Sequence, residues 1–298
     1  MDYDVVISQI SGFSGTDACG IALRSEKGLP FKLEEGDSWA LWSGPGQYKV
    51  LLGFGDWLTG CWYSPHKRCF FVSSQGYVTV FSDPESDKPG QEEQQLDAAL
   101  FGVWGLSDDL VFAWGERGGQ GVVFRGDGRV WQEMPAPPGL VIAMHGLRPD
   151  LLVAVGAQGL LARWDGRQWI PVELPAGLVL NAVWVVSEDE MFACGPSGIL
   201  MEGSVHGWAQ RLRSEHRLFG VARFANDLWL GLGPDGLGRL DQQRIEIVKP
   251  NIPSNMLDAR NELVVTSRLG FVHSRDGKQF SLTAREVLGA VAGKARLW

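Results

Sequence analysis

The chain has little that would suit a common enzyme active site or a bound metal ion. It contains no glycine-rich phosphate loop, no H-E-x-x-H and no G-x-S-x-G, which argues against the usual nucleotide, zinc-protease and α/β-hydrolase sites. Its four cysteines show no C-x-x-C spacing and no matching histidine pair, so zinc is not expected. We therefore predict no catalytic residues, no metal and no cofactor, and a protein that is not an enzyme.

The chain also lacks an excess of basic residues and any long hydrophobic run. Lys and Arg total 27 against 35 Asp and Glu, which gives a net charge of -8 and argues against a nucleic-acid partner. No run approaches the ~20 apolar residues of a membrane span. The first residues show neither a basic nor an apolar signal region, so we expect a cytoplasmic protein that contacts no membrane.

Helical periodicity is nearly absent, and a repeat with a glycine at its centre takes its place. The repeated string is a short apolar run, a turn, and a glycine that opens a second apolar run. The spacings between successive glycines are 45, 38, 39, 38 and 34 residues; these glycines are Gly76, Gly121, Gly159, Gly198, Gly236 and Gly270. Such a period indicates an array of small structural units.

Each copy holds four apolar runs of four to six residues, which are typical of strands. The second run of each copy is apolar on both faces, as expected of a strand between two neighbours. Asp-Gly pairs at Asp127, Asp165 and Asp276 fall between the third and fourth runs, where a type I′ turn would use positive φ at both positions. Four strands per unit at this period predict an all-β fold, the β-propeller.

Residues 103–131 and, next best, 142–169 carry a Val-Trp-Gly string, an apolar strand, and then Asp-Gly-x-x-Trp. In this pattern the chain resembles bacterial β-propeller repeat proteins, including the Asp-box and photosystem-assembly-factor propellers. The resemblance covers residues 58–286 and is a resemblance of fold. A strict Asp-box is absent because residues 274–280 are one residue too short, and no catalytic residue is carried over.

We predict one propeller domain over residues 1–298, with six repeats in residues 58–286. The tail, residues 287–298, resembles the opening strands of another copy, and residues 1–35 resemble the later strands. A composite closing blade shared by the two ends would remove exposed sheet edges and bring the count to seven four-stranded blades. Residues 36–57 do not fit the repeat and are predicted to be an irregular insertion, so six or eight blades are the alternatives.

Cys61 and Cys69 belong to consecutive predicted strands of one blade. A disulfide between them is one reading. The other, which the cytoplasmic setting favours, is a pair of reduced thiols.

Candidate binding residues lie in the turns before the central glycines, because loops on a rigid scaffold carry function. The turn at residues 116–120 is three residues longer than its counterparts and is expected to project. Arginine suits a docking anchor because it makes bidentate contacts. The predicted partner-binding residues are Glu116, Arg117, Gln120, Gln158, Asp235 and Arg268.

The sequence thus predicts a non-enzymatic cytoplasmic scaffold, of the immunity or assembly-factor kind, that is monomeric alone and docks a protein partner on its rim. A basic partner would suit the net charge of -8 and the acidic stretch at residues 82–96.

The alternative is a propeller enzyme or a glycan-binding protein. His145 stands where Trp62, Trp104 and Trp184 stand in other copies, and there it would serve as a general base or ligand in a central pocket. The competing reading is a packed histidine bonded to the backbone. A sialidase-like site is disfavoured because all four tyrosines lie close together in sequence, between Tyr3 and Tyr77.

Overall fold

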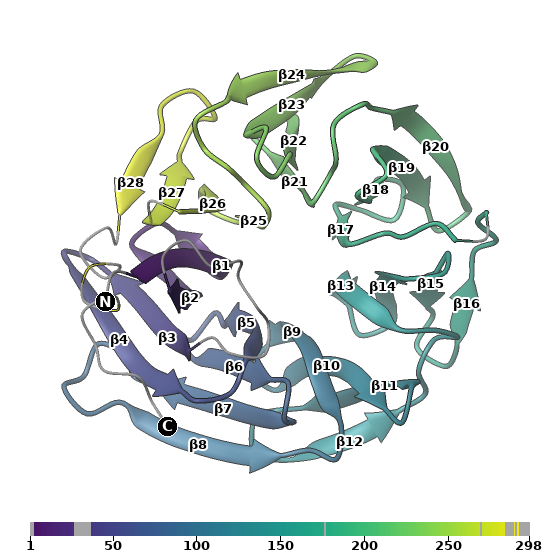
Figure 1. The fold of residues 1–298 in the computed structure, drawn as a ribbon. Helices are drawn as coiled ribbons and strands as arrows, with labels where there is room; N and C mark the ends of the chain where they lie inside the picture. Colours follow the sequence, from purple (N-terminus) through teal and green to yellow (C-terminus); the bar gives the residue numbers. More distant parts are fainter. Residues whose placement is uncertain are drawn as a thin grey trace. The chain divides into compact units, whose positions relative to one another are not determined.

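A computed structural model of the protein describes residues 3–26, 37–175, 177–268 and 270–283, together with Gly289 and Val291. These residues form 28 β-strands in seven four-stranded sheets, and in every sheet the strands are neighbours in chain order. The fold is the predicted seven-bladed β-propeller (Figure 1). The chain divides into two compact units, residues 1–103 with 258–298 (unit 1) and residues 104–257 (unit 2).

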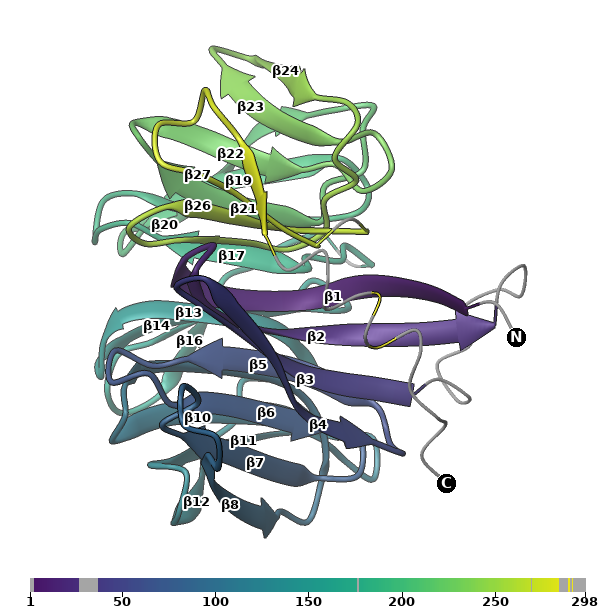
Figure 2. The same cartoon turned by 90° about the vertical axis from the view of Figure 1, so that its left-hand side faces the viewer.

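Unit 1 contains two whole blades and nearly all of a third, whose first residue, Leu257, belongs to unit 2. The first consists of β1 (Tyr3–Ser14), β2 (Asp17–Glu26), β3 (Asp37–Gly44) and β4 (Gln47–Phe54). The second consists of β5 (Leu58–Tyr63), β6 (Cys69–Ser73), β7 (Tyr77–Ser82) and β8 (Gly90–Gln95). The last in the chain consists of β25 (Leu257–Ala259), β26 (Leu263–Ser267), β27 (Gly270–Ser274) and β28 (Ser281–Thr283). In Figure 2 the long strands β1 and β2 run side by side, as their antiparallel pairing requires.

Unit 2 holds the repeats that match best in sequence. The first of its blades, whose opening strand crosses the unit boundary, consists of β9 (Ala99–Ser107), β10 (Leu110–Arg117), β11 (Gln120–Gly126) and β12 (Trp131–Met134). The next consists of β13 (Val141–Arg148), β14 (Leu151–Gly156), β15 (Leu161–Trp164) and β16 (Trp169–Pro171). Then come β17 (Ala182–Val185), β18 (Met191–Cys194), β19 (Ile199–Ser204) and β20 (Gly207–Arg213). The unit ends with β21 (Gly220–Phe224), β22 (Asp227–Gly231), β23 (Leu237–Asp241) and β24 (Arg244–Lys249).

The second strand of a blade forms the core, as its apolar sequence predicts. Every residue of β6, β14 and β18 is buried, whereas every residue of the outermost strands β8 and β20 is exposed or half-buried. In unit 2, Val153 and Val155 of β14 pack with Met191 and Ala193 of β18 in one cluster. The inner strands therefore bury apolar surface from both sides.

The central glycines mark the places where the link to the next blade crosses the sheet. Gly159 has a φ of +81°, and its N–H donates to the carbonyl of Leu178 at 2.6 Å. Gly121 lies in a strand without positive φ, but a Cβ there would stand 2.2 Å from the carbonyl oxygen of Gly139. The repeated glycine thus provides room for a passing backbone, and at most copies it also provides a left-handed turn.

The Asp-Gly pairs are turns, but not of the predicted type. Gly128, Gly166 and Gly277 have positive φ, whereas the preceding aspartates do not. Asp165 instead accepts hydrogen bonds on Oδ1 from the N–H groups of Arg167 and Gln168, both at 2.9 Å. The aspartate side chain closes the turn by bonding the backbone ahead of it.

The composite closing blade is wrong, and so is the irregular insertion at residues 36–57. The first blade takes all four strands from residues 3–54, and β3 and β4 lie within the supposed insertion. Its strands are longer than those of the other copies, which hid the repeat. Most of residues 287–298, and residues 27–36, lie outside the described part of the chain. Val291 is described: it is buried, and its carbonyl accepts a hydrogen bond from Arg24 Nη1 at 3.3 Å.

Only part of the acidic stretch at residues 82–96 is a loop, although its polar composition predicts a loop throughout. Residues 90–95 form β8, which pairs with β7 from Tyr77 to Ser82. An outermost strand is solvated on its far edge, so a polar sequence suffices for it. The remaining loop carries Glu85, which pairs with Lys67 at 2.8 Å.

Candidate protein-binding site

The turn between β10 and β11, which is called the projecting turn below, is exposed to solvent at residues 117–120. Gly118 and Gly119 have φ of +60° and +80°, and a Cβ built on either would meet nothing within 4 Å. Arg117 and Gln120 face each other in the ladder at the base of the turn, and both are exposed. Glu116, one step further in, is half-buried.

Arg117 is held in place by its own blade. Its Nη2 donates to Glu133 Oε2 of β12 at 2.9 Å, and its guanidinium carbon lies 6.0 Å from the ring centroid of Phe124. The ion pair is exposed on both sides, and such pairs contribute little to stability. Breaking this ion pair should therefore cost the fold little.

Gln158 and Asp235 lie in the equivalent turns of two further blades of unit 2. Gln158 is exposed, with a φ of +56°. Asp235 is exposed and accepts a hydrogen bond on Oδ2 from His216 Nδ1 at 2.9 Å when that nitrogen carries its proton. Both turns thus face solvent, and Asp235 has His216 beside it, a residue that sequence reasoning did not select.

Arg268 belongs to unit 1, in the turn between β26 and β27, and it is exposed. We keep it apart from the unit 2 site.

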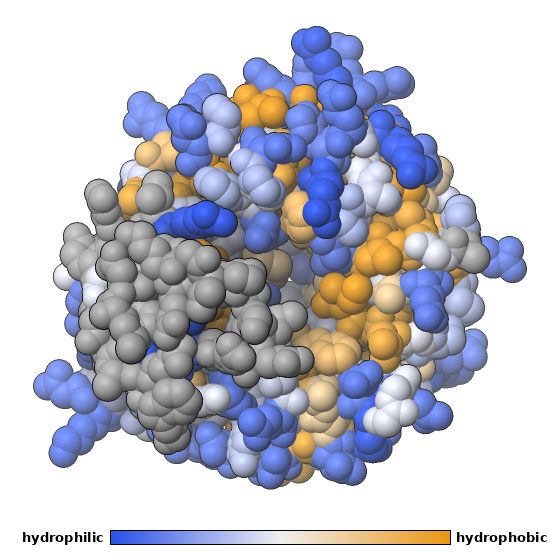
Figure 3. Space-filling model, viewed as in Figure 1, coloured by the Kyte–Doolittle hydropathy of each residue, from blue (hydrophilic) through white to orange (hydrophobic). Residues whose placement is uncertain are grey.

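An exposed apolar side chain, missed by the sequence argument, accompanies the projecting turn. Ile142 of β13 is 38% exposed, and its carbonyl accepts a hydrogen bond from Trp114 Nε1 of β10 at 3.3 Å. The link before β13 passes over Gly121 at the base of the turn. In Figure 3 hydrophobic side chains gather over β13 to β17 on the face shown. Arg117 and Ile142 are therefore carried by two adjoining blades joined at that link.

His145 lies in a row of aromatic rings on three inner strands of unit 2. Its ring centroid is 4.9 Å from that of Trp104 on β9 and 4.4 Å from that of Trp184 on β17. Its Nδ1 accepts a hydrogen bond from the N–H of Val185 at 3.2 Å. The contact matches a packed histidine bonded to the backbone, with its remaining proton on Nε2.

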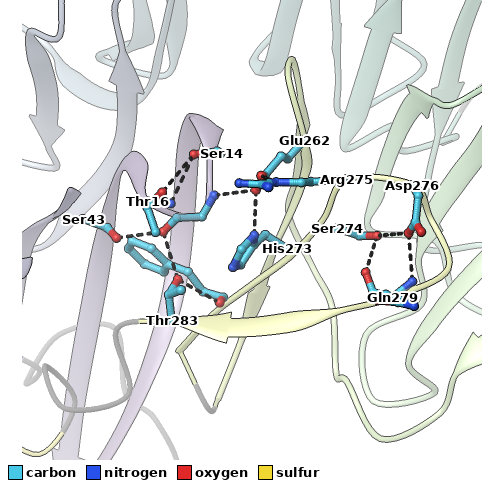
Figure 4. A network of polar contacts seen from close by, with 12 residues as sticks. Ser14, Thr16, Ser43, Glu262, His273, Ser274, Arg275, Asp276, Gln279 and Thr283 are labelled. Atoms are coloured by element: carbon cyan, nitrogen blue, oxygen red, sulfur yellow. Dashed lines mark hydrogen bonds and ion pairs between the residues drawn. The ribbon is translucent and has the colours of Figure 1, made fainter. Parts of the chain in front are cut away.

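A network of polar contacts in unit 1 joins the last blade to the first (Figure 4). Glu262, which precedes β26, is buried and accepts three hydrogen bonds. Its Oε2 receives Gly15 N–H at 3.1 Å and His273 Nδ1 at 2.6 Å, and its Oε1 receives Arg275 Nε at 2.6 Å. Burial alone would raise the pKa of Glu262, but these donors hold it below its ordinary value.

Gly15 lies in the turn between β1 and β2, and its carbonyl is hydrogen-bonded as well as its N–H. The carbonyl of Gly15 accepts hydrogen bonds from Ser43 Oγ at 2.7 Å and from Thr283 Oγ1 of β28 at 2.9 Å. A Cβ on Gly15 would stand 2.2 Å from the His273 ring. Gly15 is thus held through both its N–H and its carbonyl by side chains of two blades, which marks this network as structural.

A second clasp involves Arg260 and Asp258. Arg260 donates to the carbonyl of Tyr63 at 2.6 Å and to Ser11 Oγ at 2.8 Å, and it pairs with Asp258 at 3.1 Å. Its guanidinium lies over the ring of Phe13 at 4.6 Å. One arginine therefore ties the first, second and last blades together.

Within the described ranges, no group of three or more His, Cys, Asp or Glu side chains is arranged to hold a metal ion. None of the helical residues that the structure describes forms a segment long and apolar enough to cross a membrane.

No family model matches the chain, and no curated protein matches it in sequence. Solved structures do match. The WD40 β-propeller domain of Doa1 is 12% identical, with 95% of each chain covered and a TM-score of 0.67. YCF48 bound to D1 peptide is 13% identical, with 92% of this chain and 96% of that one covered and a TM-score of 0.60. Virginiamycin B lyase from Staphylococcus aureus is 13% identical, with 75% and 83% covered and a TM-score of 0.60.

These likenesses establish the class of protein, a β-propeller, and confirm the fold predicted from the repeats. They include a peptide-bound propeller and a lyase. Because one fold serves many functions, the functional argument rests on the site.

Proposed function

We propose that the chain is a non-enzymatic scaffold that docks a protein partner on the projecting turn of unit 2. The observation that carries the proposal is that two adjoining blades both expose a suitable side chain. Arg117 is exposed beside an open glycine turn, and Ile142 of the next blade is 38% exposed. A charged anchor beside an apolar contact is the usual composition of a small protein interface.

The partner has two required features. A carboxylate on its docking segment replaces Glu133 at Arg117, where a bidentate contact is available. An apolar side chain covers Ile142. The net charge of -8 favours a partner that is basic overall, because long-range attraction speeds encounter.

The solved structure of a similar propeller supports a protein-binding role, although it does not identify the partner of this chain. YCF48 has been solved with a peptide bound, so a propeller of this architecture can hold a protein segment. We place the scaffold in the cytoplasm as a monomer and assign it to the immunity or assembly-factor kind of protein.

A pull-down from the protein's own cytosol, read by mass spectrometry, tests the proposal. The wild type is compared with Arg117→Glu and with a matched control, Arg244→Glu, which reverses charge at a more exposed arginine of unit 2. A stoichiometric protein retained by the control and lost from Arg117→Glu supports docking at the turn. Equal capture by all three proteins would refute it.

The second candidate, an enzyme or glycan-binding protein, draws support from the row of Trp104, His145 and Trp184. Aromatic faces stack well on sugars, and a lyase shares the fold. An NMR titration of His145 with sugars and divalent metals decides the matter. Chemical shifts that move in a saturable manner favour this second function, and unchanged shifts favour the scaffold.

A further inference from the structure

Three of the four cysteines lie together in the core of unit 1. Cys19 of β2, Cys61 of β5 and Cys69 of β6 are free and buried, and all three belong to one apolar cluster. The sequence predicts that Cys61 and Cys69 lie in consecutive strands of one blade, but no pattern in it connects them with Cys19. The fold adds it from the neighbouring blade.

Strand register explains how Cys61 and Cys69 meet. Tyr63 stands opposite Cys69 in the ladder of β5 and β6, and Cys61 stands opposite Phe71. Residues two apart on a strand share a face, so Cys61 and Cys69 are diagonal neighbours on one face of this sheet.

Register also explains how Cys19 reaches them. Cys19 stands opposite Ser11 on β1, so the two side chains share a face. Ser11 Oγ accepts a hydrogen bond from the N–H of Tyr63 at 3.0 Å, which brings that face against β5. Cys19, Cys61 and Cys69 are accordingly packed in the same buried cluster.

The three thiols differ in their tendency to ionise. Burial works against the thiolate at all three positions, yet hydrogen bonds from Cys61 and Cys69 and the nearby charge of Arg260 lower the pKa of Cys19. Burial and the proximity of Cys19 raise the pKa of Cys61 and of Cys69. Cys19 is therefore the nucleophile of the group, since the thiolate is the reactive form.

We propose that Cys19, Cys61 and Cys69 form a peroxide-oxidised thiol site, in which a disulfide joins Cys19 to one of its two neighbours. The Cys19 thiolate attacks hydrogen peroxide, the oxygen–oxygen bond breaks, and Cys19 becomes a sulfenic acid while hydroxide leaves. The neighbouring thiol then attacks the Cys19 sulfur and displaces the hydroxyl, which leaves as water with the proton of that thiol. Two thiols are oxidised and one peroxide is reduced, and a dithiol reductant reverses the change.

Cys194 provides an internal control. It is buried in unit 2, in the apolar cluster of β18 and β22, and burial raises its pKa. Peroxide that reached thiols only through global unfolding would modify Cys194 as quickly as the others.

The test treats the folded wild-type protein with hydrogen peroxide, quenches, denatures, alkylates the remaining thiols, and maps them by mass spectrometry. Cys19→Ala and Cys194→Ala are treated in parallel. We expect the wild type and Cys194→Ala to lose two thiols and about 2 Da, the mass of two hydrogens, in a disulfide that contains Cys19. Cys19→Ala should keep all of its thiols, and dithiothreitol should restore those of the wild type.

Three results would overturn the proposal. They are four alkylated cysteines in the treated wild type, a disulfide between Cys61 and Cys69 that forms without Cys19, and loss of Cys194 at the rate of the others. Mapping of the wild type suffices for a decision even where Cys19→Ala folds poorly.

Discussion

Two junctions between blades are held together in different ways. In unit 2 the blade that ends with β12 continues directly into the next, and the link crosses Gly121 and reaches Gly156, where a Cβ would stand 1.9 Å from the carbonyl of Leu140. In unit 1 the blades of β1 and β28 have no such link, because they stand at opposite ends of the chain. Charged side chains hold this junction instead, chiefly Glu262 and Arg260.

The contrast shows what a covalent link does for a repeat fold. Where the chain itself passes between blades, apolar packing and a glycine suffice. Where it does not, the structure buries Glu262 with three donors and clamps Gly15 from both sides. Buried charges give specific alignment when all their hydrogen bonds are made, and they are costly when one is missing.

The largest expected effect comes from filling the space under a link. Gly121→Val and Gly159→Val should each lower the free energy of unfolding by ~1–3 kcal/mol or more, because Gly121 touches a carbonyl and Gly159 has positive φ. Thermal and urea unfolding measure the change. Gly207→Val, at a glycine with open space around it, should stay close to the wild type, and equal losses in all three variants would contradict this view of the link.

The next effect concerns the junction without a link. Glu262→Gln keeps the shape but loses the charge that receives Gly15, His273 and Arg275, and it should cost about 1–3 kcal/mol. Glu246→Gln, at an exposed ion pair with Arg239, is the control and should cost well under 1 kcal/mol. If the two variants had the same melting temperature, the Glu262 network would not be stabilising the junction.

Acid should weaken the same junction. Because the folded state lowers the pKa of Glu262 from its ordinary value of 4.5, the unfolded state binds more protons there. This contribution is fully present above pH 4.5 and is lost as the pH falls through the lower, folded-state value. Urea unfolding between pH 6 and about 3 should show the wild type converging on Glu262→Gln. A constant difference between them at all pH values would contradict the assignment.

The smallest effect on stability is expected at the docking turn. Arg117→Glu should change the free energy of unfolding by less than about 0.5 kcal/mol, since both members of its ion pair are exposed. Thermal unfolding checks this. Loss of the fold in this variant would show that the turn is structural, and the docking proposal would fail with it.

The repeats of unit 2 could be predicted because their signals are local. The glycine of each copy, the apolar second strand and the Asp-Gly turn all fall within one period, and the structure uses each of them. The projecting turn at Gly118 and Gly119 was predicted from length alone.

The first blade and the unit 1 junction could not be predicted in this way. Glu262 and Gly15 are 247 positions apart, and no local period connects them. Strand β8 was hidden because an outermost strand tolerates a polar sequence. Ile142 was missed because an apolar residue in a strand is ordinarily buried, and only the structure shows it exposed.

Amide hydrogen exchange, measured with and without the captured partner, tests the docking claim most directly. The account predicts slower exchange in peptides that cover residues 114–142, with no change at residues 203–209 or 241–246, which hold the third-to-fourth-strand turns of two other blades. Protection confined to those two turns, or to the blades of unit 1, would contradict it.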